Sequence, residues 1–282
     1  MIAFLGMGLL GSNFVKALLN KGEQVRVWNR TAEKATALEI FGAQAFADVA
    51  DAVKGATRVH LTLKDDQSVD EVLAAAHAGL QPGTYIVDHT TTSREGAEQR
   101  TREWKERGFI YLHAPVFMGP QNALESSGYM LVSGDQTVIN TLQTSLEAMT
   151  GQLVNLGAEN GKAAAMKLVG NSFLVCLTAG LIETLTVAKS LNVTPEDLST
   201  LLQVWNPGAG VAGRLKRITS GSYEQPSWEL SMSRKDTQLF LNAAKKAGHQ
   251  LILLPEIAKQ MDKWIDKGFG NHDWTIIGKD SI

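Results

Sequence analysis

The chain has 282 residues, 44% hydrophobic and 20% charged, which is the composition of an ordinary globular protein and not of a disordered one. Its 27 basic and 29 acidic residues leave a net charge of −2 without a basic block. Neither nucleic acid nor an anionic membrane surface is therefore expected as a partner. The single cysteine, Cys176, excludes an intramolecular disulfide and is typical of a reducing compartment.

The N-terminal residues are apolar but lack the basic residues of a signal peptide. The longest uncharged apolar run, residues 168–182, holds 15 residues, which is short for a membrane span. These features predict a soluble, cytoplasmic protein without a membrane partner.

The first half of the chain alternates between apolar, β-rich runs and stretches with helical periodicity. After the first run, Leu10, Phe14 and Leu18 share one helix face, and Lys21 with Gly22 is a common helix ending. Such alternation predicts a doubly wound parallel sheet with helices on both faces. We expect its strands at residues 2–5, 25–28, 59–63 and 85–87, with further strands of the same sheet at 109–113 and 129–132.

From about residue 161 the pattern becomes helical. Residues 163–191 are apolar on most faces, as in a helix buried between other elements. Further helical segments are expected at 195–204, 234–247 and 254–266. The sequence therefore predicts an α/β domain over residues 1–160 and an all-α C-terminal domain over residues 161–282, joined by a long helix.

A glycine-rich turn follows the first predicted strand and opens the first predicted helix. Its G-x-G-x-x-G pattern is weak evidence alone, but in this position it indicates a Rossmann-type dinucleotide site. Glycines permit a tight turn and a close approach to a pyrophosphate, and the helix N-terminus offers free N–H groups. A glycine turn without a ligand is the alternative. The residues expected to bind the cofactor are Gly6, Met7, Gly8, Leu9, Leu10 and Gly11.

The end of the second strand predicts which dinucleotide is bound. Proteins of this fold that bind NAD usually carry an acidic residue there, which bonds the ribose 2′-hydroxyl. This chain has Asn29, Arg30 and Thr31 instead, which offer donors and one positive charge, and an arginine fork suits a phosphate. A solvated arginine at a helix start is the alternative. These residues favour NADP (NADPH) over NAD.

Lys167 and Asn171 are four residues apart on the long apolar helix, so they share a face, and Gly170 leaves room beside it. Burial should lower the pKa of such a lysine, which suits a proton donor near neutral pH. The spacing is equally compatible with a lysine that reaches solvent beside a core asparagine.

Five motifs stand in chain order: the glycine turn, an Asp-x-Thr-Thr segment at 88–92, Ala-Pro-Val at 114–116, a segment from 157 to 171, and Lys235 with Asp236. Together they resemble the β-hydroxyacid dehydrogenase family, which includes 3-hydroxyisobutyrate dehydrogenases, semialdehyde reductases and, more distantly, 6-phosphogluconate dehydrogenases. The resemblance covers nearly the whole chain. Ala163 stands where the family usually has glycine.

The resemblance implies hydride transfer between NADP(H) and a β-hydroxyacid or semialdehyde. Lys167 would exchange the proton as general acid or base, and Asn171 would fix the substrate. Backbone N–H groups of the loop at 116–120 would hold the substrate carboxylate. The residues implied for substrate binding are Val116, Phe117, Met118, Gly119, Asn171 and Lys235.

The resemblance also implies further cofactor contacts and an assembly. The additional cofactor contacts would come from Leu63, Lys64, Thr91 and Lys235. Relatives pair through the helical domain, and a small helical domain with a long apolar helix would struggle to cover its own surface. We therefore expect a homodimer or a homotetramer.

One segment departs from the family pattern. Relatives usually continue Ala-Pro-Val with Ser-Gly-Gly, whereas this chain has Phe117, Met118, Gly119 and Pro120. Phe117 removes a hydroxyl donor and adds apolar surface, which favours a bulkier or less polar carbonyl compound over a small hydroxyacid. Two alternatives stay open. One is an imine reductase of the same architecture, although those commonly replace Lys167 by Asp or Tyr, and the other is a non-catalytic dinucleotide-binding sensor.

Other chemistry-bearing residues carry no clear site. The six histidines form no i, i+4 pair and no cluster with cysteine, so we expect no metal site. His89 is either a ligand contact or an ordinary loop histidine. Trp205 and Trp228 are expected in a core or an interface, and Cys176 in buried packing.

Overall fold

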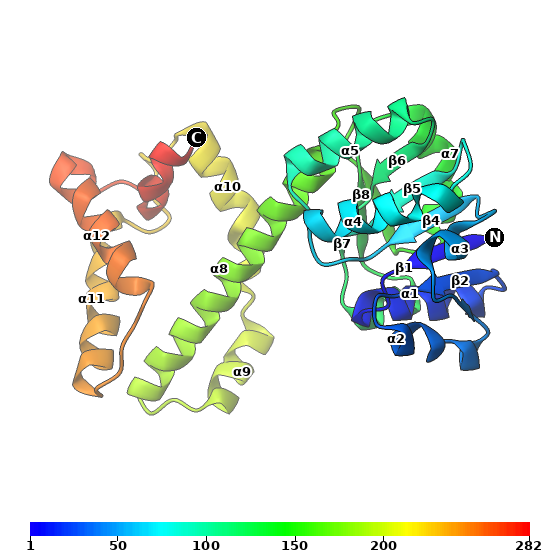
Figure 1. The fold of residues 1–282 in the computed structure, drawn as a ribbon. Helices are drawn as coiled ribbons and strands as arrows, with labels where there is room; N and C mark the ends of the chain where they lie inside the picture. Colours follow the sequence, from blue (N-terminus) through cyan, green and yellow to red (C-terminus); the bar gives the residue numbers. More distant parts are fainter. The chain divides into compact units, whose positions relative to one another are not determined.

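The alternating pattern of the first half builds a parallel sheet in the computed structural model, which describes residues 1–282 (Figure 1). Every neighbouring pair of strands runs parallel, in the order β3-β2-β1-β4-β5-β6. This confirms the predicted doubly wound α/β class. The strands are β1 (Ile2–Leu5), β2 (Val25–Trp28), β3 (Gln44–Ala45), β4 (Arg58–Leu61), β5 (Tyr85–Asp88) and β6 (Ile110–His113).

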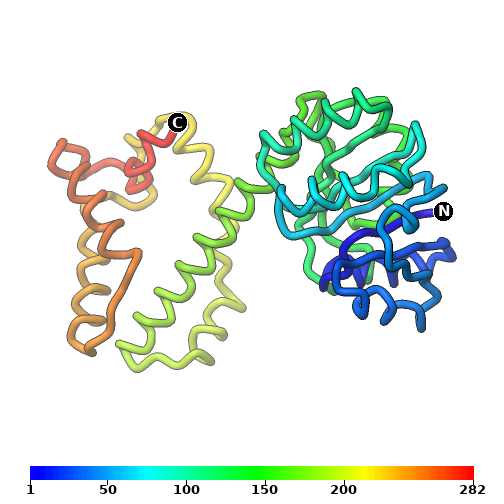
Figure 2. The backbone as a smooth tube through the Cα atoms, in the orientation of Figure 1, coloured from blue at the N-terminus to red at the C-terminus, as the bar shows by residue number.

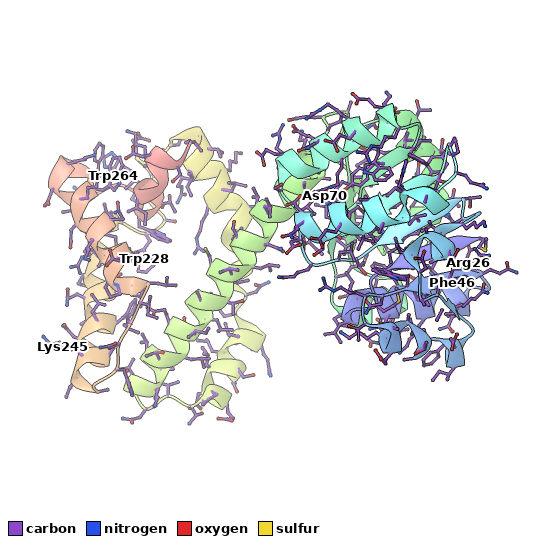
Figure 3. All side chains as sticks on the ribbon, viewed as in Figure 1. Arg26, Phe46, Asp70, Trp228, Lys245 and Trp264 are labelled. Atoms are coloured by element: carbon purple, nitrogen blue, oxygen red, sulfur yellow. The ribbon has the colours of Figure 1, made fainter.

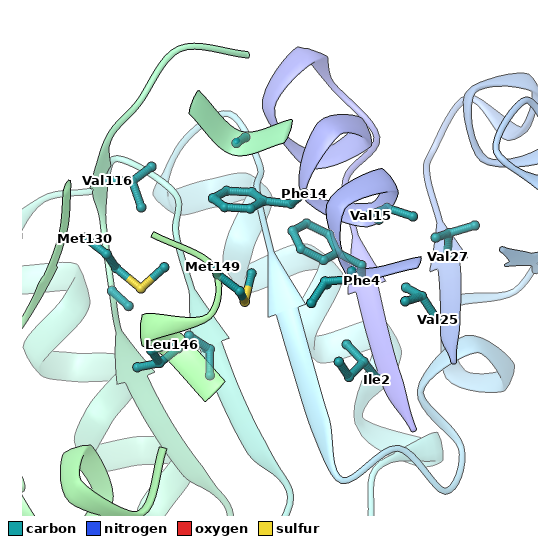
Figure 4. Packing of buried hydrophobic residues seen from close by; sticks show 14 of the residues in the cluster. Ile2, Phe4, Phe14, Val15, Val25, Val27, Val116, Met130, Leu146 and Met149 are labelled. Atoms are coloured by element: carbon teal, nitrogen blue, oxygen red, sulfur yellow. The ribbon is translucent and has the colours of Figure 1, made fainter. Parts of the chain in front are cut away.

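Helices cover both faces of this sheet, and its central strands β1 and β5 are apolar on both sides. Ile2 and Phe4 of β1 belong to one apolar cluster (Figure 4), whereas Ala3 and Leu5 belong to the cluster on the opposite face. On the second face, Arg26 of β2 lies 5.1 Å from the centroid of the Phe46 ring (Figure 3). The helices between strands are α1 (Leu9–Asn20), α2 (Ala32–Thr36), η1 (Glu39–Phe41), α3 (Val49–Val53), α4 (Asp66–Ala76), η2 (His77–Gly79) and α5 (Arg94–Glu106).

The strand expected at 129–132 exists as β8 (Tyr129–Val132), but its assignment to the same sheet was wrong. It forms a second sheet of order β7-β8-β9 with β7 (Val116–Phe117) and β9 (Gln152–Asn155). The chain leaves the first sheet at Pro115, which has no N–H to donate to a ladder and whose carbonyl accepts from the Leu131 N–H. The helices α6 (Pro120–Glu125) and α7 (Gln136–Glu147) connect these strands.

The second half is helical, as expected, and has a small core of its own. Tyr223, Leu230, Met261, Trp264 and Ile276 form this core, and Figure 3 labels Trp264 and Trp228 among the helical side chains. The elements are α8 (Lys162–Ser190), α9 (Pro195–Val204), η3 (Pro207–Gly210), α10 (Val211–Ser220), α11 (Leu230–Lys246), α12 (Leu254–Trp264), η4 (Ile265–Phe269) and η5 (Trp274–Ser281). Two compact units result, Met1–Ser172 and Phe173–Ile282, and the backbone passes from one to the other once, within α8 (Figure 2).

Helix α8 is mostly exposed, which corrects the expectation that this apolar helix is buried. Phe173, Val175 and Leu177 are 51%, 68% and 59% exposed, and Cys176 is exposed as well. Trp205 and Trp228 lie outside the core, at 56% and 39% exposure. The remaining helices of the chain leave these apolar residues of α8 uncovered.

Over its whole length α8 is also long and apolar enough to cross a membrane, by length and composition alone. It is 29 residues long, whereas the uncharged run within it is shorter because Lys167 and Glu183 interrupt the apolar residues. One helix of this kind is weak evidence for a membrane span.

Polar bonds attach α8 to the rest of the helical unit. The Glu183 carboxylate is 7% exposed and accepts from the N–H groups of Ile252 and Leu254, at 2.6 and 3.1 Å. These donors lie at the N-terminus of α12, where a negative charge is favourable. Ser190 bonds the His249 ring at 2.9 Å.

Candidate active site

The glycine-rich turn has the close backbone approaches that its sequence predicts. Gly6 has φ +101°, and a Cβ there would lie 2.2 Å from the Thr62 carbonyl oxygen. A Cβ on Gly11 would lie 2.0 Å from the Gly6 carbonyl oxygen. A Cβ on Gly8, in contrast, would meet only open space. Gly6 and Gly11 are thus required for packing, whereas Gly8 faces the space available to a ligand at the start of α1.

Asn29 fastens this turn to the end of β2. Its Oδ1 accepts from the Met7 N–H at 2.9 Å, and its Nδ2 donates to the Thr31 carbonyl at 2.8 Å. One amide hydrogen of Asn29 stays available to a ligand. The Met7 side chain is buried and Leu10 packs against the same core, whereas Leu9 is 79% exposed. Of the predicted turn contacts, Met7 therefore serves mainly to hold the turn.

A cavity of about 460 Å³ opens at the carboxyl ends of β1, β2 and β4. This edge of a parallel sheet is where dinucleotides bind in such folds. The cavity is lined by seven residues that the sequence predicts for the cofactor: Gly6, Gly8, Asn29, Arg30, Thr31, Leu63 and Lys64. The structure thus brings together the glycine turn, the end of β2 and the segment after β4.

Sequence reasoning missed the other residues of this cavity. Lys34 adds a third cation to Arg30 and Lys64, one helical turn after Thr31, and this spacing was a usable signal. Val72 and Ala75 of α4 add apolar surface, and Glu71 is the one carboxylate in the lining. The missed residues are Trp28, Lys34, Thr62, Ser68, Glu71, Val72 and Ala75.

A buried hydrogen-bond network holds the segments that follow β4 and β5. The Leu63 N–H donates to Thr90 Oγ1 and the Thr90 N–H donates to Asp88 Oδ1, both at 2.9 Å. Tyr111 donates its hydroxyl to the other oxygen of Asp88 at 2.6 Å. Burial and the neighbouring charge of Asp88 raise the pKa of Tyr111, so its hydroxyl stays protonated.

Arg100 closes this network from α5. Its side chain is 3% exposed and donates to the Tyr111 hydroxyl at 3.1 Å, to Asp70 at 3.0 Å and to Asp66. Asp66 in turn accepts from the Ser93 N–H at 2.9 Å. The two segments at 62–66 and 88–93 are therefore fixed relative to one another.

His89 is a core residue, which resolves the two possibilities left open for it. Its Nδ1 lies 2.7 Å from the Ala114 carbonyl and its Nε2 lies 3.0 Å from His60 Nδ1. A carbonyl can only accept, so His89 donates from Nδ1 and accepts the His60 hydrogen at Nε2. Burial lowers the pKa of His89 to about 4 and holds that of His60 well below its usual range. Both rings are neutral at pH 7.

The predicted proton-transfer pair is in place on α8. Lys167 Nζ donates to Asn171 Oδ1 at 3.0 Å, and it lies 4.2 Å from the centroid of the Phe117 ring. Lys167 is 9% exposed, and this burial lowers the pKa of its ammonium group. The spacing prediction and the predicted direction of the pKa shift are both confirmed.

The segment after β6 brings Phe117 against this lysine. Val116 is buried, and Phe117, Met118 and Gly119 are half-buried. Phe117 fills the space beside Gly170, since a Cβ on Gly170 would lie 2.3 Å from Phe117 Cζ. The room that Gly170 was expected to leave on the helix face is therefore taken by an aromatic ring.

Two predicted contacts stay predictions. Thr91 is exposed between the buried Thr90 and Thr92 and does not line the nucleotide cavity. Lys235 lies on α11 in the helical unit, where its Nζ is 3.1 Å from Asp236 Oδ1. Its expected contact with cofactor and substrate stays a prediction.

Residues 1–157 match the NAD binding domain of 6-phosphogluconate dehydrogenase, which is more than half of the chain. The chain belongs to the 6-phosphogluconate dehydrogenase and β-hydroxyacid dehydrogenase family. It is accordingly an oxidoreductase with a site for a nicotinamide dinucleotide, as the glycine turn and cavity indicate.

Two relatives of the chain carry different functional descriptions. "Uncharacterized oxidoreductase YfjR" of Bacillus subtilis (strain 168) is 26% identical over 281 residues, which cover 99% of this chain and 98% of that protein. The "Cytokine-like nuclear factor N-PAC" of Homo sapiens is 29% identical over 255 residues, which cover 88% of this chain but 45% of that protein.

Solved structures share the complete architecture of this family member. An imine reductase from Myxococcus stipitatus in complex with NADP+ has a TM-score of 0.90 at 21% identity, covering 98% of both chains. A reductive aminase from Aspergillus terreus in complex with NADPH4, cyclohexanone and allyl amine has a TM-score of 0.90 at 23% identity, covering 100% of this chain and 99% of that one. At these identities the likeness is one of fold.

Proposed function

We propose that this protein is an NADPH-preferring reductase that protonates a small-molecule carbonyl substrate through Lys167, and that can run in reverse as a dehydrogenase of the corresponding alcohol. The observation that carries the proposal is the Lys167–Asn171 pair, bonded at 3.0 Å on a half-buried stretch of α8. A lysine whose pKa is lowered by burial is a better proton donor near neutral pH than an ordinary surface lysine.

The residues of the nucleotide cavity fit a dinucleotide phosphate. Open space at Gly8 lets a pyrophosphate approach the α1 backbone. At the end of β2, Arg30 and Lys34 line the cavity where an acidic residue would repel a 2′-phosphate. When bound, the nicotinamide supplies or accepts the hydride. The neighbours described with NADP+ and NADPH4 support the preference, although a variant of the same imine reductase is described with NAD+.

In the reducing direction, the protein's own groups orient the substrate and deliver a proton. Lys167 Nζ donates to the substrate oxygen as the carbonyl carbon is reduced. Asn171 accepts from Lys167 and has amide hydrogens free to donate to the substrate, so it fixes the direction in which Nζ points. In the oxidising direction, neutral Lys167 takes the hydroxyl proton. The buried loop segments held by Arg100 keep the cofactor side of this arrangement rigid.

The substrate class in this proposal is a hydroxyacid, semialdehyde or related carbonyl compound. Imine reduction is the second candidate, because the architecture matches imine reductases and a reductive aminase over nearly the whole chain. A sensor without turnover would need the glycine turn but not the lysine pair. The pair therefore favours an enzyme.

We also propose that the protein works as a cytoplasmic homodimer or homotetramer. The exposed apolar residues of α8, among them Val175 at 68% and Leu177 at 59%, form a surface that monomeric soluble proteins rarely leave uncovered. A second copy of the chain would bury this surface. Light scattering at micromolar concentration tests the assembly, and a monomer would contradict it.

The activity itself is tested by NADPH consumption with small semialdehydes, bulkier ketones and cyclic imines. Reduction of a carbonyl compound would support the proposal, and reduction of imines alone would move the protein to the second candidate. NADPH binding without turnover of any substrate would contradict both.

A further inference from the structure

Phe117, the last residue of β7, packs its ring against α8 at the point where Lys167 is held. Its Cζ and Cε1 occupy the place where a Cβ of residue 170 would lie, at 2.3 and 2.8 Å. The ring therefore rests on the α8 backbone at Gly170 and cannot turn toward that helix. On this same helix, Lys167 Nζ lies over the ring at 4.2 Å from its centroid. Ring and ammonium group form one packed unit.

The contacts of Lys167 occupy most of its hydrogen-bonding capacity. An ammonium group has three N–H donors. One points to Asn171 Oδ1 at 3.0 Å, and the side toward Phe117 is covered by the aromatic face, which attracts a cation without accepting a full hydrogen bond. One donor therefore remains for a substrate, enough for a single carbonyl oxygen.

The loop beyond Phe117 offers fewer N–H groups than the carboxylate cradle that the family resemblance implies. The Gly119 N–H already donates to Asn122 Oδ1 at 2.9 Å. Pro120 has no N–H, and it begins α6, which is six residues long. Met118 packs against the apolar core of the sheet unit. The expectation that the N–H groups of this loop hold a carboxylate is thus not met at Gly119 or Pro120.

Building on the proposed function, we propose that Phe117 determines specificity, and that the substrate presents an uncharged, apolar substituent to Phe117 instead of a carboxylate. A carboxylate placed there would be partly desolvated against an aromatic face, and the cation that lies over this face is Lys167. Pairing with Lys167 would hold the ammonium group away from the carbonyl oxygen that it must protonate. A neutral substituent packs on the ring and leaves Lys167 free.

The reaction stays balanced with such a substrate. A hydride from NADPH adds to the carbonyl carbon and the proton of Lys167 adds to its oxygen, which yields an alcohol and NADP+. Lys167 then regains its proton from water. No further reactant is required.

The test compares succinate semialdehyde with its methyl ester, which share a skeleton and differ in one charge. With the wild-type protein we expect kcat/KM for the ester to exceed that for the acid by about tenfold or more, because an unpaired carboxylate loses solvation at Phe117. Phe117→Ser should narrow this ratio, mainly by lowering KM for the acid. Phe117→Leu keeps an apolar side chain and should preserve the preference for the ester.

The dissociation constant for NADPH shows whether each variant is folded, since Phe117 does not line the nucleotide cavity. An equal or greater kcat/KM for the acid in the wild type would overturn the inference and leave the proposed reductase standing. An unchanged ratio in a Phe117→Ser protein that binds NADPH normally would also overturn it. If the protein reduces neither compound and no other carbonyl compound, the proposed function and this inference are both contradicted.

Discussion

The sheet unit and the helical unit treat apolar residues in opposite ways. The sheet unit buries them on both faces of β1 and β5. The helical unit has a five-residue core and leaves many apolar residues of α8 exposed. The first unit is complete in one chain, whereas the second has a surface suited to another copy. Chemistry and assembly are thus assigned to different parts of the molecule.

The largest expected effect comes from charging the exposed side of α8. Phe173→Glu with Leu177→Glu, four residues apart on one face and 51% and 59% exposed, should turn an oligomer into a monomer, because unpaired charges in an apolar interface are costly. Light scattering measures the assembly. NADPH binding to the sheet unit should persist.

Asn140→Glu is a matched control, since Asn140 is exposed on α7 in the sheet unit. It should leave the assembly unchanged. If the α8 variant keeps the assembly of the wild type, the contrast between the two units fails.

Acid should destabilise the sheet unit through its buried imidazoles. His89, with a pKa of about 4, stays neutral in the folded protein, whereas the unfolded chain takes up a proton below about pH 6.5. Stability is therefore complete above about pH 6.5 and falls as the pH drops toward about 4, by roughly 3 kcal/mol for this group. Urea unfolding at about pH 7 and about pH 5 checks the slope, and equal stabilities would contradict it.

Asn29→Asp should change the cofactor preference without loosening the glycine turn. The carboxylate can still accept from the Met7 N–H, as Asn29 Oδ1 does at 2.9 Å. It loses the amide donor and adds a negative charge near Arg30. We expect the preference for NADPH over NADH to fall by about 10- to 100-fold, measured as two dissociation constants from the fluorescence of Trp28 in the cavity. An unchanged ratio would place the 2′-phosphate elsewhere.

Tyr111→Phe is a smaller and more local change. It leaves one Asp88 oxygen without the donor that lies at 2.6 Å, at a cost of about 1–3 kcal/mol in stability. Because Asp88 also holds Thr90, NADPH affinity should fall a few-fold. Asp70→Asn is the control. The Asp70 side chain is 59% exposed, so its ion pair with Arg100 should contribute little to stability. Equal effects of both variants would mean that the network does not position the cofactor segments.

The sequence predicted the sheet unit well because its signals are local. The glycine turn, the strand β1 and the spacing of Lys167 and Asn171 each specify backbone or face within a few residues, and all were found as expected. The placement of β8 in a second sheet depends on Pro115 and the antiparallel partner β7. The residue pattern of β8 alone does not show which strand it pairs with.

Other features depend on contacts between distant segments. The apolar composition of α8 shows that the helix needs a partner, but it cannot say whether the partner is the same chain, so its exposure was missed. Phe117 and Gly170 were both noticed, yet only the fold shows that the ring fills the space left by the glycine. The contact of Lys34 with the nucleotide cavity likewise follows from how α2 leaves β2.

The most direct test of the proposed function compares wild-type protein with Lys167→Ala in NADPH-dependent reduction of a carbonyl substrate. Loss of a general acid should lower kcat by about 10²- to 10⁴-fold, with little change in the dissociation constant for NADPH, because Lys167 does not line the nucleotide cavity. A variant that binds NADPH normally and turns over at the wild-type rate would contradict the assignment of Lys167 as the proton donor.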